Sequence, residues 1–310
     1  MQPPPTFQPV PTNRPIRLYN ETCIYCSRPF DGSLKRTTEH VIGKRFVPAG
    51  RLGRWNLIAS ACSRCNGKKA ALEGEVSAVT MQPDVHGRFA EDDDDLRLEA
   101  ARKGRGAISS RTGVPVGESQ SQFQVEMPVM PGATFRFNLT GPPQLDESRA
   151  FLLALFQMRA FFYLTTYCPE RRRGGFWLGE FVPVEALPKG DWGNPVLRSF
   201  QRLVSSWDHR LLLNAGEGFY RACMRRSPDD RPLWAWAIEW NANYRLVGFF
   251  GDKGAVDDAA ANLEFPEMKA IHQHGKEEMR LRLNTRLTDA DDVLFAWPST
   301  AIQADKALEC

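Results

Sequence analysis

The 310-residue chain lacks any long uncharged apolar run, and this absence argues against a membrane-spanning helix. Its longest apolar stretch, "AFLLALFQMRAFFYLTTY", contains Gln157 and Arg159, so we expect a buried helix there. The N-terminus, "MQPPPTFQPVPTNRP", is rich in proline and has no apolar run, so it is not an export signal. We therefore expect a disordered or extended lead over residues 1–16 and a cytoplasmic protein in a reducing compartment.

The chain also lacks a strong overall charge. Its formal net charge is +3, which does not by itself indicate a polyanionic partner. Residues 23–70, however, contain ten lysines or arginines and only two acidic residues, Asp31 and Glu39. This local excess of positive charge favours binding to nucleic acid, although scattered arginines also form ordinary solvated surfaces.

What the chain does contain is enough apolar and aromatic residues, 42% and 11%, to build a sizeable core. Alternating residues over 123–129 and 133–140 predict a hairpin, and Asp146 is typical of the residue that caps a helix. Residues 194–207 have the pattern of a shorter amphipathic helix. Residues 210–225, 231–240 and 244–251 predict three antiparallel strands.

These patterns predict an α+β chain in four parts. A lead over residues 1–16 precedes a cysteine-bearing segment, 17–80, and a linker with a hairpin, 81–145. A larger α+β domain with helices and an antiparallel sheet follows over 146–310. On its strand 231–240, alternating Trp234, Trp236, Ile238 and Trp240 indicate either core packing or a platform that stacks on bases.

Four of the seven cysteines form two pairs with the spacing of zinc ligands: Cys23 and Cys26 in "CIYC", Cys62 and Cys65 in "CSRC". In a reducing compartment such pairs indicate a metal site before disulfides. Thiolates at about 2.3 Å suit tetrahedral Zn²⁺, and four of them leave the metal no open position. We therefore expect a structural zinc that holds this segment folded, since such binding is worth about 10–16 kcal/mol in small zinc domains.

Between and after the two pairs stand "TTEHVIGKRF", "RWNLIASAC" and Asn66, directly behind the second thiol. In this order the motifs resemble the HNH nuclease family, in its branch with two zinc-binding cysteine pairs and a Glu-His or Asp-His dipeptide. The resemblance covers roughly residues 20–76. It implies the ββα-metal fold, in which a two-stranded hairpin, a loop and a helix hold one catalytic divalent ion. The expected architecture is thus a zinc-stabilised ββα-metal module over 17–80 followed by the larger domain.

The resemblance also implies the roles of four residues. His40 matches the general base that activates water, and Glu39 matches a ligand of the catalytic ion. Asn56 matches the asparagine that orients the histidine and its loop, and Asn66 matches the residue that completes the metal site. A histidine can accept a proton near neutral pH, and the oxygen ligands of Glu and Asn suit Mg²⁺ or Mn²⁺.

Strand geometry places a condition on this site, and the sequence departs from the family pattern at three positions. Adjacent strand residues point to opposite faces, so Glu39 and His40 converge only if the backbone bends or the ion lies at the strand edge. Gly43 stands where many relatives have proline, and Glu39 replaces the more frequent Asp. Asn66, as in a large subset of the family, replaces a histidine. None of these departures removes a chemically needed group.

Basic residues near the motifs are predicted to hold the phosphates that flank the cleaved bond: Lys44, Arg45, Lys68 and Lys69. Farther along the chain, "RRRGG" at 171–175 is either a phosphate-contacting loop or a solvated turn.

The sequence therefore predicts a metal-dependent DNA endonuclease with structural Zn²⁺ and catalytic Mg²⁺ or Mn²⁺. A role in restriction or phage defence is implied by the resemblance alone. Residues 146–310 would select the target or bind a protein partner or a small-molecule signal. The alternative is a zinc-stabilised nucleic-acid-binding or interaction module without catalysis.

Overall fold

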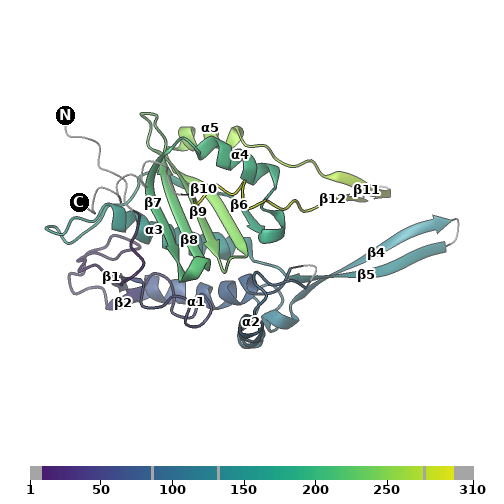
Figure 1. Ribbon diagram of the computed structural model, residues 1–310, viewed down its shortest axis with the longest axis horizontal. Helices are drawn as coiled ribbons and strands as arrows, with labels where there is room; N and C mark the ends of the chain where they lie inside the picture. Colours follow the sequence, from purple (N-terminus) through teal and green to yellow (C-terminus); the bar gives the residue numbers. More distant parts are fainter. Residues whose placement is uncertain (1–8, 85–86, 131–132, 275–276, 297–310) are drawn as a thin grey trace.

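The structure, a computed structural model, describes residues 9–84, 87–130, 133–274 and 277–296 (Figure 1). The helices are α1 (Ser63–Thr80), α2 (Asp94–Gly106), α3 (Glu147–Thr165), α4 (Pro195–Val204) and α5 (Lys253–Ala261). The strands are β1 (Ile16–Arg17), β2 (Arg36–His40), β3 (Leu57–Cys62), β4 (Gln120–Met130), β5 (Ala133–Pro143), β6 (Glu180–Pro188), β7 (Asp208–Ala215), β8 (Tyr220–Arg226), β9 (Leu233–Trp240), β10 (Tyr244–Gly251), β11 (Lys269–His274) and β12 (Glu277–Leu281). The predicted α+β class is confirmed, because these helices stand beside largely antiparallel sheets.

The first sheet joins three short strands and leads directly into α1. Its order is β1-β3-β2, with β1 parallel and β2 antiparallel to the central β3. All six residues of β3, "LIASAC", are buried. Cys62 ends β3 and is also the residue before the first turn of α1, so no loop separates the strand from the helix.

The larger sheet has five antiparallel strands in the order β6-β10-β9-β8-β7. Helices α4 and α5 cover one face, and α3 covers the other (Figure 1). Trp236, Ile238 and Trp240 are fully buried on the face that packs against α3, so their alternation reflects core packing. The indole N–H of Trp240 donates to the side-chain oxygen of Gln157 at 3.0 Å, which places this polar residue of α3 inside the core.

Residues 17–80 and residues 146–310 share one hydrophobic core. The ring of Phe46 lies edge-on to that of Trp240, with 5.6 Å between the centroids. The Asn241 side chain donates to the Thr80 hydroxyl at 2.7 Å, at the end of α1. The sequence boundary between the two predicted domains is therefore not a boundary between two cores.

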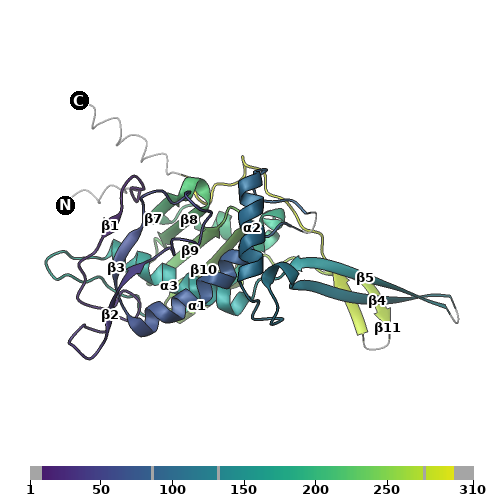
Figure 2. The ribbon, with the colours of Figure 1, turned by 90° about the horizontal axis from the view of Figure 1, so that it is seen from below.

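Two hairpins extend from this body. Strands β4 and β5 pair antiparallel and project to one side, where β11 and β12 also lie (Figures 1 and 2). The hairpin predicted over residues 123–140 is thereby confirmed, whereas the second hairpin was not predicted. Residues 1–8 of the predicted lead lie outside the described residues. The part that follows is ordered, because Val10 donates its N–H to Leu212 of β7 at 3.0 Å and Ile16 begins β1.

The strand predictions for the larger sheet are partly correct. Residues 210–225 form two strands, β7 and β8, because the chain turns at Gly216–Gly218, where both glycines have positive φ. Strand β6 was not predicted. The helix predicted to begin after Asp146 is α3, and the Asp146 carboxylate accepts the N–H of Arg149 at 3.2 Å. In the described part of the chain, no helix is long and apolar enough to cross a membrane.

Candidate metal centre and histidine site

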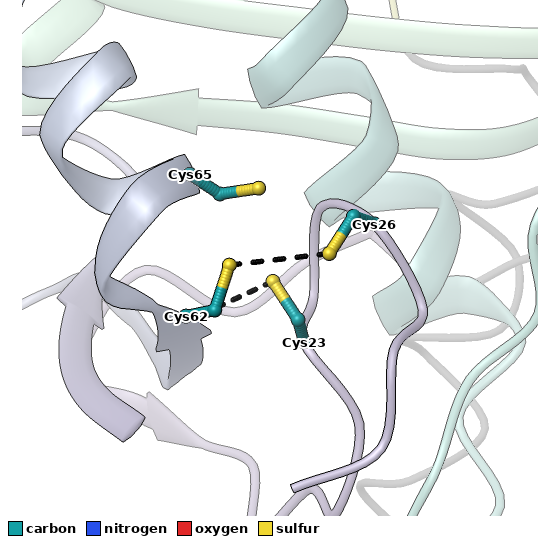
Figure 3. Close-up of side chains that lie close together, drawn as sticks. All are labelled: Cys23, Cys26, Cys62 and Cys65. Carbon is teal, nitrogen blue, oxygen red and sulfur yellow. Dashed lines mark hydrogen bonds between the residues drawn. The ribbon is translucent and has the colours of Figure 1, made fainter. Parts of the chain in front are cut away.

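The four paired cysteines meet at the start of α1 (Figure 3). Their sulfur atoms all lie within 4.8 Å of one another, and Sγ of Cys26 and Sγ of Cys62 are 4.0 Å apart. Tetrahedral zinc with thiolate bonds of about 2.3 Å places its sulfurs about 3.8 Å apart. The cluster therefore fits a metal ion such as zinc, and it is the one cluster of this kind found in the described residues.

Local backbone geometry brings the two pairs together. Cys23 and Cys26 lie in a tight turn between β1 and β2, closed by the bridge between Thr22 and Pro29. Ser27, next to Cys26, takes a positive φ of 59°, which lets the chain reverse direction directly after the second thiol. Cys62 and Cys65 occupy the end of β3 and the first turn of α1, so the metal would tie the turn to the helix.

Hydrogen bonds favour a thiolate at Cys23. The Cys65 thiol and the backbone N–H of Cys62 hydrogen-bond to its sulfur, and together they lower the pKa of Cys23 to about 5. Burial, followed by the charge of Cys23, raises the pKa of Cys26, and the hydrogen bond to Cys23, followed by burial, raises the pKa of Cys65. A divalent ion would stabilise all four thiolates, because metal ligation requires the deprotonated form.

His40 lies at the end of β2, half-buried, opposite Ile58 of β3. Arg17 of β1 pairs with the same Ile58 from the other side, so these two side chains flank one position of the central strand. Burial and the positive charges of Lys44, Lys69 and Arg17 hold the pKa of His40 below its ordinary value of 6.5. The imidazole is therefore neutral at neutral pH, which is the form that accepts a proton.

Asn56 fixes the backbone that follows His40. Its side-chain N–H donates to the carbonyl of Ile42 at 2.7 Å, and its side-chain oxygen accepts the N–H of Ile42 at 3.3 Å. Asn56 is 4% exposed, so both bonds are shielded from water. Through this contact Asn56 can position the loop beside the histidine.

A buried ion cluster lies on the other side of β2 from the His40 side chain. The ammonium group of Lys69, on α1, contacts the carboxylates of Glu39 at 2.8 Å and Glu73 at 2.7 Å. It also donates to the backbone carbonyl of His40 at 3.1 Å. Lys69 and Glu39 are 1% and 3% exposed. We call Lys69, Glu39 and Glu73 the lysine cluster.

Two of the predicted site residues belong to the lysine cluster. Lys69 was predicted to contact phosphate, but its ammonium group is buried and engaged by two carboxylates. Glu39 was predicted to bind the catalytic ion, but its carboxylate faces Lys69 away from water. Burial raises the pKa of Glu39, and Lys69 only partly offsets that effect. The strand alternation thus keeps Glu39 and His40 on opposite faces, with no bend that brings them together.

Asn66 is half-buried in the first turns of α1, and its side-chain N–H donates to the Thr37 hydroxyl at 3.0 Å. It therefore lies beside β2, but the Glu39 carboxylate with which it was expected to share an ion is taken by Lys69. In this arrangement the predicted pair of oxygen ligands does not fit a Mg²⁺ or Mn²⁺ ion, because an ammonium group already neutralises the one carboxylate.

The remaining predicted phosphate contacts are exposed. Lys44 and Arg45 follow the loop after β2, and Lys68 lies on the outer side of α1. The ammonium group of Lys103 on α2 donates a hydrogen bond to the carbonyl of Arg45 at 2.6 Å, and this contact holds the loop against α2. These three side chains are accessible to a large ligand, unlike that of Lys69.

Glu73 is a participant that the sequence reasoning missed. Its carboxylate accepts the N–H of Gly43 at 2.9 Å, and a Cβ at position 43 would lie 2.6 Å from that carboxylate. A proline there would also lack the donated N–H. The signal was available, because Glu73 follows Lys69 by four residues on a predicted helix, the spacing of a side-chain ion pair.

A cleft of about 420 Å³ lies between the end of α1, the base of β5, and β6. Residues lining it include Gln82, Tyr244 and Arg282, and no sequence-predicted site residue is among them. Comparison with profiles of known protein families, with curated proteins and with solved structures gave no match. The likeness to the HNH nucleases therefore rests on the motifs of this chain alone.

Proposed function

We propose that this chain is an HNH-type endonuclease that hydrolyses DNA phosphodiester bonds, with His40 as the general base. The observation that carries the proposal is the placement of His40. A neutral, half-buried imidazole ends a strand, flanked by the cationic side chains of Arg17 and Lys44, next to a loop clamped by Asn56. A base surrounded by cations suits attack of water on an anionic ester.

The cysteine cluster supports the same proposal. Zinc held by four thiolates has no open position, so its part would be to fix the start of α1 relative to β2 and β3. Asn66, one residue after Cys65, then takes a fixed place beside β2. Exposed Lys44, Arg45 and Lys68 would supply charge for the flanking phosphates.

The HNH resemblance also implies a catalytic Mg²⁺ or Mn²⁺, and the proposal keeps this ion as a component to be tested on its own. The lysine cluster stands against an ion at Glu39 in the arrangement described. This same observation favours a second candidate function, a zinc-stabilised DNA-binding module without catalysis. The two candidates differ in whether DNA is cut. Both leave open a role in restriction or phage defence, and a partner or signal for residues 146–310.

A plasmid nicking assay on the full-length, zinc-loaded protein separates the candidates. The assay compares the wild type with His40→Ala, and with His209→Ala as a matched control. His209 is also half-buried and lies on β7 of the other sheet. We expect nicking by the wild type and by His209→Ala, and a loss of several orders of magnitude in His40→Ala.

Three further arms, with Mg²⁺, with Mn²⁺ and with EDTA under conditions that retain zinc, test the divalent ion. Nicking that survives EDTA would remove the ion from the proposal while leaving the nuclease intact. Absence of nicking in every arm, together with tight DNA binding, would establish the non-catalytic alternative.

A further inference from the structure

An open cleft of about 660 Å³ lies beside the cysteine cluster, between the turn that carries Cys23 and the loop that follows α3. Figure 1 shows the segment after α3 next to the N-terminal strands at one end of the molecule. The cleft is lined by four arginines: Arg36 of β2 and Arg171, Arg172 and Arg173 of the loop. We call it the arginine cleft.

The loop of the arginine cleft is held in a defined shape. Cys168 donates its N–H to the carbonyl of Arg173 at 3.0 Å, and Arg172 donates its N–H to Pro169 at 3.2 Å. Arg172 takes a positive φ of 50°, a backbone conformation that is uncommon for residues other than glycine. A Cβ on Gly174 would lie 2.2 Å from the carbonyl of Tyr163, so the loop is pressed against α3. The arginines thus project from a fixed turn.

One of the three loop arginines is used as an anchor. The guanidinium group of Arg172 donates to the carbonyl of Tyr19 at 2.9 Å and forms an ion pair with Glu21 at 2.8 Å. Its backbone carbonyl accepts the N–H of Glu21 at 2.8 Å. Arg171 and Arg173 are exposed, and no ion pair of theirs within 4.0 Å was found in the described part of the chain. The anchor leaves two guanidinium groups available to a ligand.

The two acidic residues of the cleft are both engaged. Glu21 is paired with Arg172, and Asp31 accepts the N–H and the hydroxyl of Ser33 at 3.0 and 2.6 Å. Arg36 lies over the ring of Phe30, 5.3 Å from its centroid, and donates to the hydroxyl of Ser60 at 2.8 Å. The cleft therefore presents oriented cationic donors, the arrangement that binds phosphate oxygens.

The position of Arg36 relates the arginine cleft to the histidine site. Arg36 and His40 are four residues apart on β2 and lie on the same face of the strand. Four strand residues span about 13 Å. Because the phosphates of one strand wind around the helix axis, two contact points this far apart would be separated by only a few nucleotides.

From these observations we propose that the arginine cleft binds the DNA backbone on one side of the cleavage point. The inference rests on the proposed function, because it takes DNA as the ligand. The common face of Arg36 and His40 favours a polyanion that runs along the strand over a compact acidic protein. Under this proposal, residues 146–310 contact the DNA substrate directly, through the loop that follows α3.

The test measures binding of the full-length, zinc-loaded protein to a short fluorescent DNA duplex over a range of salt concentrations. All proteins carry His40→Ala so that the DNA stays intact. Arg171→Ala with Arg173→Ala should weaken binding and reduce the slope of log K against log salt by about 1.8, since each phosphate contact contributes about 0.9. Arg171→Lys with Arg173→Lys should retain most of that slope, because it keeps the charges.

The matched control is Arg102→Ala with Arg105→Ala, which removes two exposed arginines of α2 away from the cleft. It should leave both affinity and slope unchanged. Unchanged zinc content and melting temperature confirm that the variants are folded. An unaltered slope in the Arg171 and Arg173 variant would overturn the inference, and tighter binding to an acidic peptide than to DNA would also overturn it. The nicking assay reports on the proposed function separately, so a nuclease with an unaltered slope would lose only the cleft.

Discussion

The lysine cluster and the cluster around Arg245 are both buried ion clusters, but they have different surroundings. Arg245 of β10 pairs with Glu239 of β9 at 2.8 Å and with Asp292 at 2.7 Å, and its side chain is fully buried. Its guanidinium carbon lies 3.9 Å from the centroid of the Trp192 ring. We call Arg245, Glu239 and Asp292 the arginine cluster.

The surroundings decide what each cluster can do. The arginine cluster is enclosed by the sheet and by aromatic rings, and none of its contacts reaches a sequence-predicted site residue. The lysine cluster touches the backbone of His40 and adds its charge to the field around the imidazole. Burial of an ion pair therefore does not by itself mark a functional site. Contact with a partly exposed titratable group is the more informative feature.

Loss of the metal should produce the largest difference in local stability between the regions that hold the two clusters. Cys23→Ser leaves three thiolates, so we expect loss of about one bound zinc per chain and a lower unfolding midpoint. Hydrogen exchange should accelerate in β2 and α1, which hold the lysine cluster, while amides of β9 and β10 stay better protected. Elemental analysis and exchange mass spectrometry check this. Cys223→Ala, at a buried cysteine outside the cluster, should retain zinc, and unchanged zinc in Cys23→Ser would contradict the assignment.

The next largest effect should come from breaking the arginine cluster. Arg245→Met removes the cation shared by Glu239 and Asp292. Because Glu239 keeps its ion pair with Arg221 at 2.6 Å, we expect the free energy of unfolding to fall by about 3 kcal/mol, the lower end of the range for broken buried pairs. Urea denaturation measures the loss. The control is Arg231→Ala, whose pair with Asp258 is more than half exposed and should cost no more than about 1 kcal/mol. Equal losses in both variants would mean that burial does not set the strength of these pairs. DNA nicking by folded Arg245→Met should be unchanged.

Breaking the lysine cluster should have a smaller and pH-dependent effect. Lys69→Met removes the charge that partly offsets burial, so the pKa of Glu39, already raised, should rise further. A carboxyl group with a raised pKa in the folded state binds protons more tightly when folded, so stability falls as pH rises through that pKa. We expect a loss of up to about 3 kcal/mol near neutral pH, shrinking as the carboxylate protonates in acid. Urea midpoints at several pH values test this, and a loss independent of pH would argue against it.

These predictions depend on features that the sequence revealed unevenly. The cysteine cluster was predictable, because two pairs of cysteines, each two residues apart, have the spacing of metal ligands. The buried helix α3 and its cap at Asp146 were predictable for the same kind of reason, since periodicity and a local capping bond are both short-range. The sequence of β7 and β8 was read as one strand, because a turn through Gly216 and Gly218 looks like a weak strand when no partner is known.

The sequence identified the residues of the candidate site, but it did not predict which of their side chains contact one another. Nothing in the linear sequence tells whether Lys69 turns toward solvent or toward Glu39. That choice depends on the face of α1 that packs on β2, and it is fixed by the long-range contact between helix and strand. The arginine cleft shows the same limit. The motif at residues 171–175 was noted, but its position beside Glu21 arises from packing across about 150 residues of chain.

The smallest effect should come from the charge nearest to His40. Lys44 is exposed, and after burial its charge is the largest of those that lower the pKa of His40. If His40 is the base, nicking should rise with pH, and the midpoint of the rise should lie below pH 6.5, because only the neutral imidazole accepts a proton. Lys44→Gln should then move the midpoint of this profile upward, and added salt should produce a smaller shift in the variant than in the wild type, since salt screens exposed charges.

Glu73→Gln provides the matched comparison for this last shift. It changes a charge of the lysine cluster without removing a cation next to the imidazole, and Glu73 is absent from the groups that set the pKa of His40. The pH profile of nicking by Glu73→Gln should therefore keep the wild-type midpoint, even if the substitution lowers the stability of the protein. A midpoint that moves in Glu73→Gln but not in Lys44→Gln would show that the pH profile depends on the lysine-cluster side of β2 and not on the His40 side. The titrating group would then belong to the lysine cluster, and His40 would no longer be the candidate base.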